Sequence, residues 1–243
     1  KLHRLNCPYE LVMFILEYLK GRKCYIELNQ SKSIIFDIEK GVPQGSCLGP
    51  ILFLLFHCEL PQRIAAATHS HLFADDLALI INGSPWWPHS DFASNMQTSA
   101  QTALDQLQTY ATEWKQPINS SKTEWQWVHR RVTLPTIALK LDSHPIKRTP
   151  LFKYLGFHVD ERLTFNKHCA FMLQKVQKNS TLLKYVAQSQ TSSTSVRHLL
   201  CQAFIHPYLR MIYTVWPMLS AGVIASIERK NRQLSRLTHR WMD

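Results

Sequence analysis

The stretch HLFADDLALI, residues 71–80, places two adjacent aspartates, Asp75 and Asp76, inside an otherwise apolar run. The apolar flanks are typical of core strands, and a tight hairpin with both aspartates at its tip fits the flanks and the charges together. Adjacent carboxylates repel each other, so burying both without a counter-ion costs free energy. Mg²⁺ removes this cost, because it prefers carboxylate oxygens as ligands. The residues alone leave a metal-binding pair and a solvated pair as equal alternatives.

A glycine-rich segment, GVPQGSCLGP at residues 41–50, precedes this hairpin. Three of the seven glycines of the chain, Gly41, Gly45 and Gly49, fall here at a spacing of four residues. Glycine permits positive φ and lets the backbone approach a ligand closely. The segment therefore either presents its backbone to a nucleotide or nucleic acid, or forms an ordinary turn before a helix that starts near Leu48.

The rest of the chain is predicted to mix helices with short strands before residue 160 and to be helical after it. Helices are expected over residues 8–20, 51–60, 96–114, 166–187, 194–216 and 223–242, the second of them buried. Strand pairs are expected over residues 23–38, 68–81 and 151–160. The predicted fold is α+β over residues 1–160, followed by an all-α segment over residues 161–243.

Charge separates the same two parts of the chain. Residues 1–139 contain 12 Lys and Arg and 12 Asp and Glu, whereas the net charge of +11 lies entirely from Lys140 onward. A basic segment joined to a neutral one predicts that a polyanion is bound, although solvated basic helices are an equal alternative. The six cysteines are scattered, which predicts free thiols in a reducing compartment rather than disulfides or a zinc site.

Membrane and secretion signals are not found in the sequence. The longest apolar run, ILFLLF at residues 51–56, is far shorter than the roughly 20 residues that cross a bilayer. No membrane partner is expected. The chain starts at Lys1 rather than Met, so it is expected to be a fragment of a longer protein.

Four ordered motifs resemble the reverse transcriptases of non-LTR (LINE-type) retrotransposons. GVPQGSCLGPILFLLF is followed by FADD, then by WKQPINSSKTE at residues 114–124 and by FKYLGFHVDERLTFNKH at residues 152–168. The segment YTVWPMLSAGVIASIERKNRQLSR, residues 213–236, resembles the region after the thumb in these elements. The resemblance implies a partial right-hand polymerase palm over residues 1–160, with an antiparallel sheet and helices. A basic helical thumb and post-thumb region would follow over residues 161–243.

The resemblance also implies roles for particular residues. Asp75 would bind the two catalytic Mg²⁺ (or Mn²⁺) ions, with Asp76 as its weaker neighbour, and Lys122 would assist the leaving group. The nucleotide and template pocket would be lined by Gln44, Gly45, Ser46, Phe73 and Ala74, and the primer grip would be formed by Tyr154, Leu155 and Gly156. The implied partners are an RNA template, a DNA primer and dNTPs, and the implied location is intracellular and nuclear.

One part of the family pattern is missing from this sequence. The family carries a third catalytic aspartate in an earlier segment similar to FDxxKAFD, and no aspartate precedes Asp37 here. The ligand set is therefore expected to be incomplete and residues 1–243 alone are expected not to polymerise. Two alternatives stay open: a catalytically inactive remnant or co-opted copy that binds nucleic acid, and a group II intron maturase-like protein.

Overall fold

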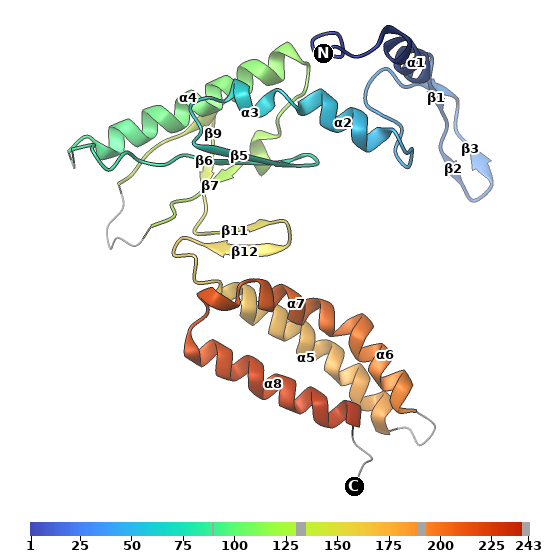
Figure 1. The fold of residues 1–243 in the computed structure, drawn as a ribbon, viewed down its shortest axis with the longest axis vertical. Helices are drawn as coiled ribbons and strands as arrows, with labels where there is room; N and C mark the ends of the chain where they lie inside the picture. Colours follow the sequence, from blue (N-terminus) through green and yellow to red (C-terminus); the bar gives the residue numbers. More distant parts are fainter. Residues whose placement is uncertain (89, 130–134, 189–192, 240–243) are drawn as a thin grey trace. The chain divides into compact units, whose positions relative to one another are not determined.

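The computed structural model describes residues 1–88, 90–129, 135–188 and 193–239, which form a mixed α+β fold (Figure 1). The chain divides into two compact units. Unit 1 comprises Lys1–Ser120 and Pro135–Pro145, and unit 2 comprises Ser121–Leu134 and Ile146–Asp243. The division into palm and thumb at residue 160 is a functional assignment and stays a prediction.

Within its described residues, unit 1 combines four helices with short antiparallel strand pairs. Its helices are α1 (Tyr9–Leu19), α2 (Gly49–His57), α3 (Leu60–Arg63) and α4 (Phe92–Glu113). Its strands are β1 (Lys23–Cys24), β2 (Glu27–Leu28), β3 (Ser31–Lys32), β4 (Phe36–Asp37), β5 (His69–Phe73), β6 (Asp76–Ile80), β8 (Lys140–Leu141) and β9 (His144–Pro145). The antiparallel pairs are β1 with β4, β2 with β3, β5 with β6 and β8 with β9.

Unit 2 has two strand pairs and a helical bundle. Its strands are β7 (Glu124–Trp125), β10 (Lys147–Arg148), β11 (Leu151–Tyr154) and β12 (Phe157–Asp160). Its helices are α5 (Asn166–Gln188), α6 (Thr194–Phe204), α7 (His206–Thr214) and α8 (Ala221–His239), with a 3₁₀ turn, η2 (Trp216–Met218), before α8. β10 pairs with β7 in parallel and β11 pairs with β12 in an antiparallel hairpin. The chain first passes from unit 1 to unit 2 within the 3₁₀ turn η1 (Ser120–Lys122), and it passes again from unit 1 to unit 2 between Pro145 and Ile146.

The hairpin β5–β6 is the predicted one, and it rests on α3 and α4. Leu72, Leu77 and Leu79 on its inner face pack against a core that includes Ile64 of the segment after α3 and Tyr110 of α4. Residues opposite each other in this register share a face, so the inner and outer faces alternate along both strands. The outer face is exposed, and Phe73 on it is 62% exposed to solvent. The expectation of core strands therefore holds for one face of the hairpin only.

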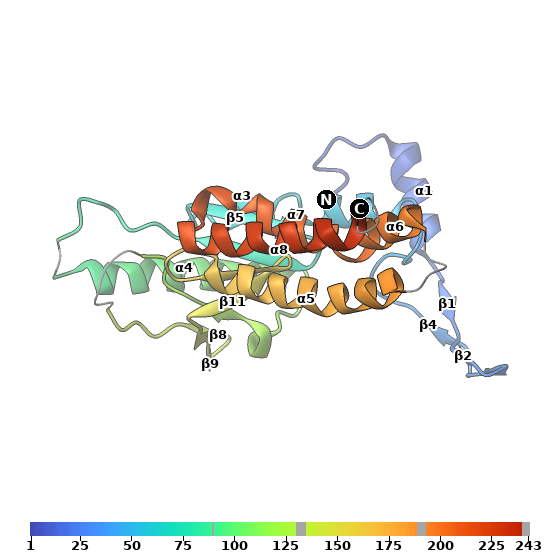
Figure 2. The same ribbon diagram turned by 90° about the horizontal axis from the view of Figure 1, so that it is seen from below.

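The N-terminal part of unit 1 is unusually rich in exposed apolar side chains. The helix predicted at residues 51–60 forms as α2, but it buries Leu52 and leaves Ile51 and Leu54 exposed, so the expectation of a buried helix is wrong. The predicted hairpin at residues 23–38 forms as β1–β4 and β2–β3, and in both views its tip projects from unit 1 (Figures 1 and 2). Ile34, between β3 and β4, is 86% exposed.

The bundle of unit 2 holds its own apolar core. Cys169, Val176, Ile212 and Ile227 are fully or almost fully buried at its centre. α5 and α8 lie side by side along their lengths in both views (Figures 1 and 2). The helix expected over residues 194–216 is divided into α6 and α7, because Pro207 has no backbone N–H to continue the helical ladder.

The described helices and cysteines bear on two further expectations. Within the described ranges, none of the helices combines the length and the apolar character needed to span a bilayer. All six cysteines are free thiols, as predicted. Burial raises the pKa of Cys169 to about 11 and also raises that of Cys201, so both thiols stay protonated near neutral pH.

Candidate functional site

The two aspartates lie at the tip of the β5–β6 hairpin, as the sequence predicts. Phe73 and Asp76 face each other as the last strand pair, which leaves Ala74 and Asp75 as a two-residue turn. Asp75 is therefore a turn residue, and Asp76 shares the outer face of the hairpin with Phe73. Both aspartates are exposed. The structure brings residues 73–76 together in one short, solvent-facing turn.

Ala74 gives this turn an unfavourable backbone. Its φ of +51° lies in the left-handed region, which costs a non-glycine residue roughly 1–2 kcal/mol. Positive φ at the first of two turn residues is the pattern of a type II′ hairpin turn, where glycine is usual. Strained backbone of this kind tends to occur at functional sites. Here it lies directly before both aspartates.

Replacing Ala74 by glycine is expected to stabilise the chain by about 0.5–1 kcal/mol, because glycine adopts positive φ without steric cost. Urea unfolding followed by circular dichroism measures this change. Ala78→Gly is the matched control in β6, opposite His71, and is expected to destabilise by a similar amount since glycine weakens a strand interior. Equal effects of the two substitutions would contradict the assignment of strain to Ala74.

The glycine-rich segment forms a structured turn before α2. Gly41 and Gly45 both have φ of +81°, which is the use predicted for them. Gly49 serves a different purpose, because a Cβ there would lie 2.8 Å from the Pro43 carbonyl oxygen. The Ser46 hydroxyl donates to that same carbonyl at 2.8 Å and accepts the Gly49 backbone N–H at 3.0 Å. Ser46 therefore holds the turn together.

Arg22 supports the glycine-rich segment, and the sequence analysis assigned it no role. Its guanidinium donates to the Leu19 carbonyl at the end of α1 and to the Gly41 carbonyl at 2.6 Å. This pair of bonds fixes the start of the glycine-rich segment to α1. Gln44 and Gly45 are exposed beyond this anchor. Among the described residues, no hydrogen bond or ion pair links residues 44–46 to residues 73–76.

The predicted primer-grip residues form the turn of the β11–β12 hairpin in unit 2. Leu155 and Gly156 are its two central residues, with φ of +47° and +88°, as a type I′ turn requires. A Cβ on Gly156 would lie 3.0 Å from the Met211 methyl of α7, so the turn packs closely on the bundle. Within the described part of the chain, the buried Tyr154 hydroxyl has no hydrogen-bond partner.

Asp160 joins this hairpin to the bundle. One carboxylate oxygen accepts the backbone N–H groups of Arg162 and Thr164, both at 3.1 Å. The other accepts the Phe165 N–H at 2.8 Å and the Thr164 hydroxyl at 3.1 Å. Partial burial favours a raised pKa for Asp160, but the four donated hydrogen bonds outweigh it and lower the pKa.

His168 completes the junction on α5. Its ring is fully buried, lies 4.9 Å from the Phe157 ring between centroids, and accepts the His158 backbone N–H through Nδ1 at 3.3 Å. Burial lowers the pKa of His168 and outweighs the opposing effect of the Met211 backbone, and the nearby His158 ring makes a smaller lowering contribution. Asp160 and His168 both lie in the segment FHVDERLTFNKH quoted above, and the sequence analysis assigned neither a role.

An exposed stripe along α5 combines cations with apolar and aromatic side chains. Lys167, Phe171, Lys175, Lys178, Leu182 and Tyr185 follow one another at helical spacings of three or four residues, and all are exposed. The Lys175 ammonium lies 5.3 Å from the centre of the Phe171 ring. Within the described ranges, none of the three lysines forms an ion pair. We call these six residues the α5 stripe.

Lys122 and the primer-grip turn belong to unit 2, whereas the aspartates and the glycine-rich segment belong to unit 1. Lys122 ends η1 and is exposed. The predicted site residues therefore form three local groups, residues 44–46, 73–76 and 154–156, together with Lys122.

The aspartate turn places two carboxylates side by side. Two exposed carboxylates supply the hard oxygen donors that Mg²⁺ prefers, so their chemistry fits the ion. Among the described residues, no group of three or more His, Cys, Asp or Glu side chains is arranged to hold a metal ion. Asp75 and Asp76 are thus the two carboxylates that this turn could offer to an ion.

Comparison with known proteins identifies the family. Residues 1–159 match the family described as reverse transcriptase (RNA-dependent DNA polymerase). The chain belongs to this reverse transcriptase family. Its relatives are polymerases of non-LTR retrotransposons, as the motif resemblance predicted. No solved structure matches the chain significantly.

Three relatives illustrate the extent of the similarity. The RNA-directed DNA polymerase from mobile element jockey of Drosophila melanogaster is 28% identical over 72% of this chain and 19% of its own length. The probable RNA-directed DNA polymerase from transposon X-element of the same species is 25% identical over 96% of this chain and 25% of its own length. A Pol polyprotein of retrotransposable element R1 from Bradysia coprophila is 26% identical over 66% of this chain and 15% of its own length. This reverse transcriptase chain spans about a quarter or less of these relatives.

Proposed function

We propose that this chain is the part of a LINE-type RNA-directed DNA polymerase that presents two metal-binding aspartates and holds an RNA–DNA duplex. In this assignment residues 1–160 are part of the palm and residues 161–243 are the thumb and post-thumb region. The observation that carries the proposal is the α5 stripe, because it joins unpaired cations to exposed aromatic rings on one helix face.

The charge around the α5 stripe favours a polyanion. Residues 163–227 contain no Asp or Glu, so no carboxylate from this long segment competes for Lys167, Lys175 or Lys178. The stripe extends over about 27 Å at 1.5 Å per residue, which is long enough to follow several phosphates of a duplex. Lysine binds phosphate as a point charge and releases condensed counterions. If the lysines of the α5 stripe were merely solvated, the absence of Asp and Glu from residues 163–227 would have no explanation.

The aspartate turn supplies the proposed chemistry. Asp75 and Asp76 would hold Mg²⁺ or Mn²⁺ together with ligands from outside this turn. Such an ion lowers the pKa of a bound hydroxyl and stabilises charge on phosphate oxygens. The exposed outer face with Phe73 leaves the turn open to a primer end and a nucleotide. Tyr154, Leu155 and Gly156 would orient the primer, and Lys122 would assist protonation of the leaving group.

Duplex binding as a function of salt tests the proposal. Fluorescence anisotropy with a labelled 16-base-pair RNA–DNA duplex measures the affinity at each salt concentration. Three phosphate contacts give a slope of log affinity against log salt of ~0.9 per contact, so the affinity is expected to fall about 40-fold between 50 and 200 mM KCl. Lys175→Gln with Lys178→Gln is expected to remove most of this slope. Lys20→Gln with Lys32→Gln is the matched control, because both lysines lie in unit 1 beside Glu17 and Glu27.

Two results would overturn parts of the proposal. Salt-independent binding, or equal effects of the two double substitutions, would contradict duplex binding by the α5 stripe. Primer extension with Mg²⁺ by the 243-residue chain, lost in Asp75→Ala, would contradict the expectation that its ligand set is incomplete. Binding without extension is the expected result, and the inactive nucleic-acid-binding alternative shares it. The extension assay repeated on a longer chain that adds an upstream aspartate separates the two.

A further inference from the structure

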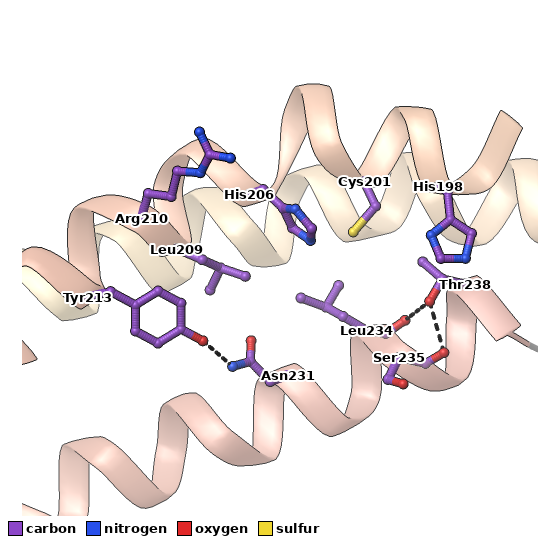
Figure 3. Close-up of a pocket in the computed structure, with 10 residues that line it drawn as sticks. All are labelled: His198, Cys201, His206, Leu209, Arg210, Tyr213, Asn231, Leu234, Ser235 and Thr238. Carbon is purple, nitrogen blue, oxygen red and sulfur yellow. Dashed lines mark hydrogen bonds between the residues drawn. The ribbon is translucent and has the colours of Figure 1, made fainter. Parts of the chain in front are cut away.

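A cavity of about 570 Å³ lies in the bundle of unit 2, between α6 and α7 on one side and α8 on the other (Figure 3). Cys201, Leu209 and Leu234 line it with buried apolar side chains. The cavity is open to solvent along the exposed residues of its rim. Its volume lies in the range of small-molecule sites, so it accommodates one nucleotide but not a duplex.

The polar side of the cavity holds one permanent cation, a guanidinium, together with an imidazole. His206, at the start of α7, and Arg210, one turn later, both line it and are exposed. None of the ten lining residues is acidic, and residues 163–227 contain no Asp or Glu at all. An anionic ligand is therefore favoured over a neutral or cationic one.

An aromatic ring closes one end of the cavity. Tyr213 is 45% exposed, and its hydroxyl accepts the side-chain amide N–H of Asn231 of α8 at 2.6 Å (Figure 3). Its ring lies 5.4 Å from that of Trp216 between centroids. These contacts from two sides fix the ring while part of its surface stays accessible. A fixed, accessible ring is the element on which unpaired bases stack.

We propose that this cavity binds one unpaired nucleotide of a single-stranded nucleic acid, with the base against Tyr213 and a phosphate beside Arg210 and His206. The inference rests on the proposed nucleic-acid-binding function and adds a second site to it, since none of the residues of the α5 stripe lines the cavity. The combination of an apolar wall, an aromatic end, the guanidinium of Arg210 and the imidazole of His206 matches a base linked to a phosphate. An acidic peptide would use the guanidinium but would leave the ring and the apolar wall without a partner.

Fluorescence of a five-nucleotide RNA with a central 2-aminopurine tests this site, because stacking quenches that base. The full chain is expected to quench it saturably. Tyr213→Leu is expected to weaken binding about tenfold or more, as loss of base stacking does elsewhere. Tyr213→Phe keeps the ring and is expected to bind within twofold of the unmodified chain. Arg210→Gln is expected to weaken binding severalfold, with partial recovery in Arg210→Lys.

Duplex binding is measured on the same variants and separates this inference from the proposed function. Unchanged duplex affinity with weakened single-strand affinity supports the cavity. If the chain does not bind the single strand, the inference is overturned while duplex binding stands. The same holds if neither Tyr213→Leu nor Arg210→Gln weakens single-strand binding. Equal competition by a Glu-rich peptide also overturns it, whereas a free nucleoside monophosphate, which carries the same base and phosphate, is expected to compete. If the unmodified chain binds the single strand but not the duplex, the result counts against the proposed function and leaves the cavity assignment in place.

Discussion

Replacing Asp160 by alanine is expected to lower the free energy of unfolding of unit 2 by about 3 kcal/mol, because four hydrogen bonds to one carboxylate are lost together. Three of the donors are backbone N–H groups of the loop between β12 and α5, so this loop loses its fixed path. The β11–β12 hairpin would then lose its alignment with α5. Urea unfolding at pH 7, followed by circular dichroism, measures the change.

Two further variants control the Asp160 experiment. Asp160→Asn keeps one acceptor oxygen and is expected to retain about half of the stabilisation. Asp91→Ala removes an exposed aspartate at the start of α4 whose side chain makes no capping bond, and is expected to change stability by less than ~0.5 kcal/mol. A loss in Asp160→Ala no larger than in Asp91→Ala would show that the carboxylate does not organise the junction.

Acidification is expected to destabilise unit 2 through His168. Burial lowers the pKa of His168 below the ordinary 6.5, so below that pH the unfolded chain binds a proton that the folded chain does not. The contribution is complete above pH 6.5 and is lost as the pH falls below it, with a slope that approaches about 1.4 kcal/mol per pH unit. The lowered pKa of Asp160 acts in a separate range, since its contribution is present above pH 3.8 and lost below.

His168→Phe isolates this response. The ring against Phe157 is kept, but the acceptor for the His158 N–H is lost, so the variant is expected to be less stable at pH 7.5. Its stability between pH 6.5 and 5 is expected to fall less steeply than that of the unmodified chain. Burial also lowers the pKa of His57 in unit 1, so His57→Phe is the comparison variant. An unchanged slope in His168→Phe would assign the acid response to other groups.

Local signals predicted most elements of this fold. Apolar residues at helical spacing identified α1, α4, α5 and α8, and alternating runs identified the β5–β6 and β11–β12 hairpins. The division of α6 from α7 was missed although Pro207 is visible in the sequence, because the apolar periodicity continues across it. The exposure of α2 was missed since an apolar run does not reveal which of its faces finds a partner.

The residues of the candidate site could be predicted from the sequence, but their backbone conformation and contacts could not. The aspartates at a hairpin tip followed from the flanking strands, whereas the positive φ of Ala74 did not, because alanine carries no preference for that region. Asp160 and His168 act through hydrogen bonds and ring contacts formed only when β12 meets α5. The α5 stripe could have been read from spacing alone, since Lys167, Phe171, Lys175 and Lys178 already lie on one helical face.

The exposed apolar side chains of the N-terminal part of unit 1 make that region surface active. Phe14 and Leu16 of α1, Leu28 of β2 and Ile34 before β4 all present more than half of their surface to water. Side chains of this kind adsorb at air–water interfaces, and the free edges of short strand pairs promote association between chains. Thin films for electron microscopy would therefore hold the first forty residues of unit 1 at the air–water interface.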